Sequence, residues 1–154
     1  METTRPAHEN DRTACIALLT RALFDVDTMR GGTTLRGEVG HNELLARWLN
    51  PAADDAALYV GEFHQVVVGL AAAVTFTRHG STVSSGRIEC CYVEEGARGV
   101  GVGAALMESM VTWCRQRGCN DIDALALPGD RLSKQRLEAS GFSARLLVLN
   151  RPLS

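Results

Sequence analysis

The sequence lacks an apolar stretch long enough to cross a membrane. Its longest strongly apolar run is Val66 to Val74, whereas a membrane-spanning helix needs about 20 apolar residues. The segment Met1 to Arg12 is polar and carries charges of both signs, so it also lacks the apolar core of a secretory signal. We therefore expect a cytoplasmic protein with no membrane partner.

The sequence also lacks a large excess of either basic or acidic residues. The chain has 16 Lys and Arg against 18 Asp and Glu, a formal net charge of −2. The basic residues are scattered along the sequence, whereas binding to a phosphate backbone usually leaves a clustered basic patch. We expect no nucleic-acid partner.

The cysteines and histidines lack the spacing of a disulfide framework or a metal site. No C-x-x-C pair occurs, the number of cysteines is odd, and the four histidines are far apart in sequence. This pattern favours reduced thiols and predicts no bound metal. We expect most of the five cysteines to be small packing residues: Cys15, Cys90, Cys91, Cys114 and Cys119. For Cys90 and Cys91 we expect packing and not nucleophilic catalysis.

What the sequence does contain is a composition typical of one folded domain. Of its 154 residues, 45% are apolar and 22% charged, enough to form a core without crosslinks. We expect a single domain over residues 1–154. In its first half the patterns predict a strand, a capped helix with an apolar stripe, a long loop, a short helix and a β-hairpin: Thr3 to Ala7, a helix from Asn10 or Asp11 carrying Ile16, Leu19 and Leu23, the loop Phe24 to Gly40, Asn42 to Leu49, and Leu58 to Phe63 with Val66 to Thr77 around His64-Gln65.

The second half alternates strands and helices, an order typical of an α/β domain with some parallel pairing. The predicted elements are Arg87 to Val93, a helix Gly103 to Arg117, Ile122 to Leu127, a helix Arg131 to Ser140, and a last strand Ala144 to Leu149.

A glycine-rich turn joins the first of these strands to its helix. It reads Arg98-Gly99-Val100-Gly101-Val102-Gly103-Ala104. Helix N-termini carry unpaired N–H groups and partial positive charge, and glycines allow an anion to approach those amides closely. The spacing differs from the dinucleotide-binding G-x-G-x-x-G pattern, and no P-loop lysine follows. The remaining alternative is a flexible connection without a ligand.

The turn matches the pattern [QR]-x-x-G-x-[GA] at Arg98, Gly101 and Gly103, and the chain therefore resembles the GNAT superfamily of N-acetyltransferases. The run Ile88 to Val93 is similar to the fourth strand of that family, and Glu138 to Phe142 to its late helix-to-strand junction. The resemblance implies a GNAT-type fold, with a central mixed sheet flanked by helices, and acetyl-CoA as the co-substrate. It further implies that the pyrophosphate binds residues 98 to 104 and that the pantetheine arm binds Cys91, Tyr92 and Val93.

Glu89 is the candidate catalytic base. An amine must lose its proton before it attacks a thioester, because a lysine-like amine has a pKa near ~10.4, and GNAT enzymes often carry a base on this strand that acts through water. Strand alternation places Glu89, Cys91 and Val93 on one face and Ile88, Cys90 and Tyr92 on the other. A solvent-facing position or a structural ion pair is the alternative for Glu89.

The sequence departs from the family where many members carry a tyrosine that protonates the leaving thiolate. Leu137 occupies that position; water, Ser133 or Tyr92 could serve instead. Asp130 stands where asparagine is common and is equally expected as the N-cap of the following helix. Ser133 is also a candidate cofactor contact. We expect Arg136 on the solvated face of this helix, with reach to the cofactor as the alternative.

The leading functional hypothesis is direct acetyl transfer to a primary amine of a small molecule, with the N–H of Val93 or Tyr92 polarising the thioester carbonyl. The loop Phe24 to Gly40, the second helix and the late strands would form the acceptor pocket, with acids suited to a cationic amine: Asp25, Asp27, Glu38 and Glu43. The alternatives are a non-catalytic acyl-CoA-binding module, a longer acyl donor, and a protein N-terminus or lysine as the acceptor. The resemblance also favours a homodimer.

Overall fold

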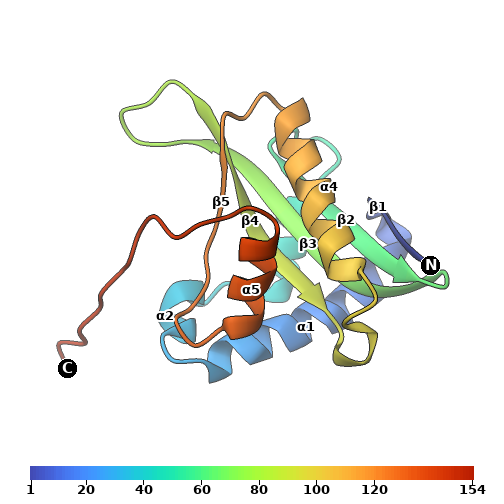
Figure 1. Ribbon diagram of the computed structural model, residues 1–154, viewed down its shortest axis with the longest axis horizontal. Helices are drawn as coiled ribbons and strands as arrows, with labels where there is room; N and C mark the ends of the chain where they lie inside the picture. Colours follow the sequence, from blue (N-terminus) through green and yellow to red (C-terminus); the bar gives the residue numbers. More distant parts are fainter.

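The computed structural model describes all residues from Met1 to Ser154 and contains one mixed sheet flanked by helices (Figure 1). The sheet has five strands in the order β1-β2-β3-β4-β5. Along the chain, the strands and helices follow in this order: β1 (Glu2–Pro6), a 3-10 turn (Glu9–Asp11), α1 (Arg12–Thr28), α2 (Gly32–Arg36), α3 (His41–Trp48), β2 (Ala56–Phe63), β3 (Val66–Thr77), β4 (Ser84–Val93), a second 3-10 turn (Glu95–Ala97), α4 (Val102–Gln116), β5 (Ile122–Ala124) and α5 (Arg131–Ala139).

Each face of the sheet is covered by its own apolar core. On one face, residues of α1 and α3 such as Leu19 and Leu45 pack against alternate residues of β2 and β3. On the other face, α4 buries Leu106 and Met110 against the remaining alternate residues. Because both faces of β3 are covered, its middle, Leu70 to Ala73, is fully buried, as its nearly continuous apolar sequence predicts.

The hairpin and the α4 helix confirm the sequence predictions, but the predicted loop from Phe24 to Gly40 is wrong. Helix α1 continues to Thr28, and α2 follows at Gly32. No glycine or proline lies between Phe24 and Arg30, so the helix continues past Phe24 and ends only at Thr28, where the next residue, Met29, is extended. Gly31, with a left-handed φ of 79°, then begins α2. The pair Asp27 and Arg36 then joins α1 to α2.

The parallel pair β4 and β5 diverges almost at once. Pairing extends only from Gly86 with Ile122 to Ile88 with Ala124, so the predicted strand Ile122 to Leu127 is too long. Beyond Ile88, β4 runs on to Val93 without a neighbour on that side. An open sheet edge faces α5 at this point, where no other strand pairs with the backbone of β4.

The predicted last strand, Ala144 to Leu149, is absent. After Phe142, whose N–H donates to the carbonyl of Leu137, the chain leaves the domain without regular structure (Figure 1). It exposes Leu146, Leu147, Val148, Leu149 and Leu153 by at least 82% each. The sequence favours a strand here, but within one chain nothing pairs with it. None of the helices has the length and apolarity to cross a membrane.

Candidate active site

The glycine turn, residues 98–104, forms a cradle of backbone N–H groups at the start of α4. Gly99 and Gly101 have left-handed φ values of 85° and 94°, which strongly favour glycine at both positions. The first helical bond runs from Ala105 N to Gly101 O, and the N–H groups of residues 99–101 donate to no acceptor within the chain. No side chain caps the helix either. The predicted cradle residues therefore come together, with backbone donors available to a diphosphate.

Arg98 stabilises the junction between strand and cradle. Its Nε donates to the carbonyl of Val93 at 2.9 Å, and its guanidinium lies 5.6 Å from the ring centroid of Tyr92. The end of β4 therefore fixes the Arg98 side chain, and its positive charge remains beside the glycine turn.

The open edge of β4 presents alternate backbone groups to α5. Glu94 N donates to Val68 O of β3, so by strand alternation the N–H of Tyr92 also points to β3, while those of Cys91 and Val93 point to the open side. The carbonyls of Cys91 and Val93 meet arginine side chains there. This corrects the expectation that Tyr92 could donate its N–H to a thioester: only the N–H groups of Cys91 and Val93 are directed to the open side.

A β-bulge at Glu89 overturns the predicted division of β4 into faces. Ala72 pairs with Cys90 and Ala73 pairs with Ile88, which leaves Glu89 as an extra residue. The alternation of side chains between the two faces of β4 therefore shifts by one residue after Glu89. Ile88, Cys91 and Val93 pack with the α4 core, whereas Cys90 and Tyr92 pack with the α1 and α3 core.

The Glu89 carboxylate is directed to α3, away from the face of Cys91 and Val93. Trp48 Nε1 donates to Glu89 Oε1 at 2.9 Å, and Arg47 Nη1 lies 3.3 Å from the same oxygen. The side chain is 24% exposed, so it is oriented but still reached by water. The sequence offered no signal for Trp48 or Arg47, because neither belongs to the glycine-turn pattern.

A narrow groove separates β4 from α5 beside the cradle. Its walls include Cys90 and Cys91 of β4, Met107 of α4, and Ser133, Arg136 and Leu137 of α5. Leu137 packs against the α4 core, so the position of the family tyrosine is apolar here.

Asp130 precedes α5 as its N-cap, whereas Arg136 lies in the second half of the helix. Asp130 Oδ1 accepts the N–H of Ser133 at 3.0 Å, which confirms the N-cap interpretation. Arg136 lies inside the groove, with Nη1 3.4 Å from Cys91 O. The expected solvated position of Arg136 is therefore wrong: the diverging strands leave a gap, and the arginine bends into it.

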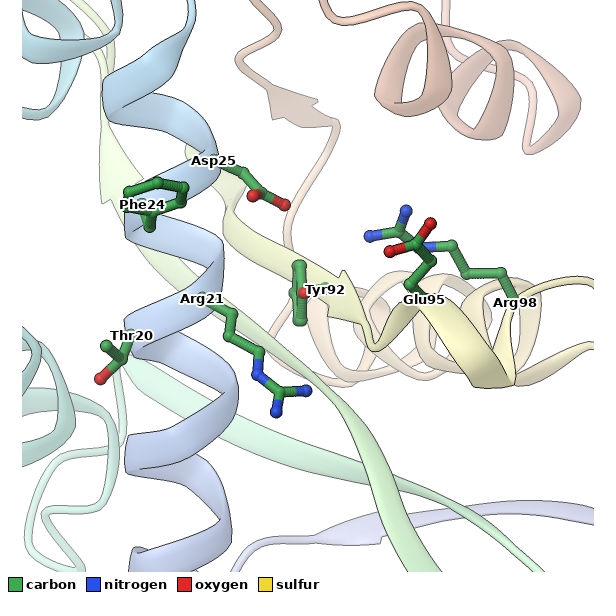
Figure 2. A pocket seen from close by; sticks show the side chains of 7 residues that line it. All are labelled: Thr20, Arg21, Phe24, Asp25, Tyr92, Glu95 and Arg98. Atoms are coloured by element: carbon green, nitrogen blue, oxygen red, sulfur yellow. The ribbon is translucent and has the colours of Figure 1, made fainter.

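A second cavity of about 460 Å³ opens on the opposite face of the sheet, between α1 and the end of β4 (Figure 2). This volume lies in the range of small-molecule sites. Tyr92 lies at its centre, Asp25 points into it from α1, and Glu95 and Arg98 border the far side. The remaining lining residues are Thr20, Arg21 and Phe24.

Of the four acids expected near an acceptor, only Asp25 lines this cavity. Asp27 is held by two hydrogen bonds from Arg36, 2.7 and 2.8 Å long, and this guanidinium lowers the pKa of the Asp27 carboxyl. Glu38 and Glu43 are exposed and line neither the groove nor the cavity.

The cysteines of β4 do not have the environment of nucleophiles. Burial raises the pKa of the Cys90 thiol to about 12 and also raises that of Cys91. A reactive thiolate needs the opposite shift. No group of three His, Cys, Asp or Glu side chains is arranged to hold a metal ion.

The comparisons with known proteins agree with this geometry. A model of the acetyltransferase (GNAT) family matches residues 28–142. No curated protein matches the chain.

Several solved structures share its fold. The aminoglycoside N-acetyltransferase AAC(6')-Iy in complex with CoA has a TM-score of 0.76 at 17% identity, covering 100% of this chain and 96% of that chain. A predicted acetyltransferase with acetyl-CoA from Clostridium acetobutylicum has a TM-score of 0.73 at 20% identity, covering 97% and 96%. The aminoglycoside acetyltransferase meta-AAC0020 from an uncultured soil metagenomic sample, in complex with sisomicin, has a TM-score of 0.71 at 17% identity, covering 99% and 95%. At these identities the likeness establishes the fold.

Proposed function

The chain belongs to the acetyltransferase (GNAT) family, and from that premise we propose that it transfers the acetyl group of acetyl-CoA to a primary amine of a small molecule. The observation that carries the proposal is the set of unpaired N–H groups over residues 99–101 at the start of α4, next to the open edge of β4. A diphosphate fits the first and an extended amide chain the second.

The residues of β4 supply the chemistry. Pantetheine amides would pair with the backbone groups that Cys91 and Val93 direct to the open side of β4. One of the two N–H groups would stabilise the oxyanion that forms as the amine attacks the thioester carbonyl. Glu89, oriented by Trp48, would receive the ammonium proton through water. Positioning of the two reactants provides most of the remaining acceleration.

The cavity around Tyr92 is the proposed acceptor site. Asp25 and Glu95 offer carboxylates to a cationic amine, and the ring of Tyr92 offers an apolar surface. Two structural neighbours are aminoglycoside acetyltransferases, which supports a small amine as the acceptor without identifying it. Arg21 and Arg98 border the same cavity, so a strongly polycationic acceptor would meet repulsion there.

Leu137, in place of the family tyrosine, favours one alternative. Without a proton donor for the thiolate, the chain could bind acetyl-CoA without turning it over. Transfer to a protein N-terminus or lysine, or from a longer acyl donor, would use the same cradle.

Calorimetric titration with acetyl-CoA, followed by an assay of CoA release with a panel of amines, tests the proposal. A Gly101→Glu variant places a carboxylate in the cradle and should weaken binding at least about tenfold, or ~1.4 kcal/mol. Gly118→Glu is the matched control, because Gly118 also has a left-handed φ, of 76°, but lies at the far end of α4. A folded wild type that does not bind would refute the acetyltransferase proposal, and binding without CoA release for any amine would favour the binding module.

We also propose that the chain forms a homodimer through its C-terminal segment. Leu146 and Val148 alternate with Leu147 and Leu149, so both faces of this extended segment are apolar, as in a strand covered on both sides. The outer edge of β5 has no neighbour in the sheet. Exchange of the segment between two copies would cover both surfaces at once.

A further inference from the structure

Arg136 lies where a ligand in the groove would have to pass. Its Nη1 is 3.4 Å from the carbonyl oxygen and 3.6 Å from the sulfur of Cys91, so it occupies the free edge of β4. The same guanidinium also lies against the cradle: a Cβ added to Gly103 would stand 2.9 Å from Arg136 Nε and 3.0 Å from Cζ. Gly103 therefore gives the guanidinium room against the first turn of α4.

The charge of Arg136 has no partner. No carboxylate lies within ion-pair distance of it, although ten other pairs join acids and bases of this chain. Its contacts are a carbonyl oxygen and a thiol. A half-buried guanidinium without a counter-charge next to a helix N-terminus is electrostatically unfavourable, because both are positive. An anion bound at the cradle would relieve this repulsion.

The groove is also too narrow in this conformation. Its volume of about 60 Å³ is well below the roughly 300 Å³ at which small-molecule sites usually begin. Ser133 and Leu137 belong to the helix wall and Cys91 to the strand wall. Of the lining residues, Arg136 has the longest side chain and crosses the opening, so its rotation widens the groove without moving either wall.

We propose that Arg136 determines the specificity of this site for CoA thioesters over thioesters that end at pantetheine. The inference rests on the proposed function. An entering pantetheine arm displaces the guanidinium from Cys91 O. This carbonyl oxygen can then accept a hydrogen bond from a pantetheine N–H. The released guanidinium, already against Gly103, turns to the diphosphate and forms charge-assisted hydrogen bonds there. A thioester without phosphates requires the same displacement but offers Arg136 no anion in return.

The test compares acetyl-CoA with S-acetylpantetheine on wild type and Arg136→Gln, with both dissociation constants measured by calorimetry. We expect the variant to bind acetyl-CoA about tenfold more weakly, in line with the loss of a charge-assisted hydrogen bond. It should bind S-acetylpantetheine several-fold more tightly, because the shorter side chain leaves the groove open. Arg136→Lys, which keeps the charge, should retain most of the preference for acetyl-CoA. Arg131→Gln, on the exposed first residue of α5, is the matched control and should change neither constant.

Opposite shifts for the two ligands cannot come from partial unfolding, which weakens both. If the wild type binds acetyl-CoA and Arg136→Gln leaves the ratio of the two dissociation constants unchanged, for instance by weakening the binding of both thioesters equally, the inference is wrong and the proposed function stands. If the folded wild type binds neither thioester, the proposed function fails and the inference fails with it.

Discussion

Trp48 on α3 donates its indole N–H to Oε1 of Glu89 on β4, over a distance of 2.9 Å. The contact exists because the bulge at Glu89 turns that side chain to the α3 face. Trp48 is itself 4% exposed, so the carboxylate has a rigid donor on one side, while Arg47 and water reach it from the exposed side. A base fixed in this way needs little reorganisation before it accepts a proton.

We therefore predict that Glu89→Gln lowers kcat by about 100-fold, the lower end of the effect of general bases, and leaves the dissociation constant of acetyl-CoA unchanged. The amide preserves the shape and the bond from Trp48 but cannot act as a base. Rates of CoA release and calorimetry measure the two quantities. Glu108→Gln, on the exposed side of α4, should affect neither, and an unchanged kcat in Glu89→Gln would remove Glu89 from the mechanism.

The acid stability of the domain should depend on Asp11. Arg5 donates two hydrogen bonds to its carboxylate, of 2.8 and 2.9 Å, and this pairing lowers the pKa of Asp11. A carboxyl with a lowered folded-state pKa stabilises the fold above its unfolded value near ~3.9, and the contribution disappears as pH falls through the folded value. At pH 7 we expect Asp11→Asn to lose about 2 kcal/mol, with the gap to wild type closing below pH ~4.

Urea unfolding at several pH values measures this difference. Glu9→Gln is the control, because Glu9 pairs with Arg12 on the surface, where ion pairs contribute little. A gap between Asp11→Asn and wild type that stays constant down to pH 2 would contradict the assignment.

Thiol reactivity should distinguish packing cysteines from the rest. Burial raises the pKa of Cys15 to about 11 and those of Cys90 and Cys114 to about 12. At pH 8 such thiols are ionised to about one part in a thousand or less. We predict slow reaction of these three, and of Cys91, with a disulfide reagent in the native protein, and a fast phase due to Cys119 alone. Cys119→Ser should abolish the fast phase, and a fast phase that survives would locate a reactive thiol elsewhere.

Removal of residues 144–154 should convert the protein from dimer to monomer. The deletion removes the apolar C-terminal segment and touches no residue of either core, so the fold should persist. Light scattering coupled to size exclusion gives the mass, and circular dichroism checks the fold. Arg151→Gln, beyond the apolar run, should remain dimeric. A monomeric full-length chain would refute the proposed interface.

The features that depend on short stretches of sequence could be predicted. The cradle is one example, since alternating glycines followed by an amphipathic helix determine its backbone locally. The N-cap of α5 at Asp130 is another. The hairpin turn at His64-Gln65, where both φ values are positive, was placed by the β-rich runs on either side of it.

The features that depend on pairing between distant segments could not be predicted. The bulge at Glu89 is a matter of register between β3 and β4, and a shift of one residue reverses every face assignment that follows. The position of Arg136 depends on how far β5 diverges from β4. The segment after Phe142 has the composition of a strand, but strand structure also requires a partner, which one chain does not provide.

Helix α5 contributes no buried residue to the domain, and this weak attachment couples its stability to whatever fills the groove beside it. A ligand that touches both β4 and α5 adds its binding free energy to the closed arrangement, by RT ln(1 + [L]/Kd). In hydrogen–deuterium exchange, the amides of residues 131–142 would then gain far more protection than those of β3, which open only when the whole protein unfolds. By the same linkage, any change of solution conditions that frays α5 weakens ligand binding. The measured affinity of the site therefore depends on how well α5 is ordered.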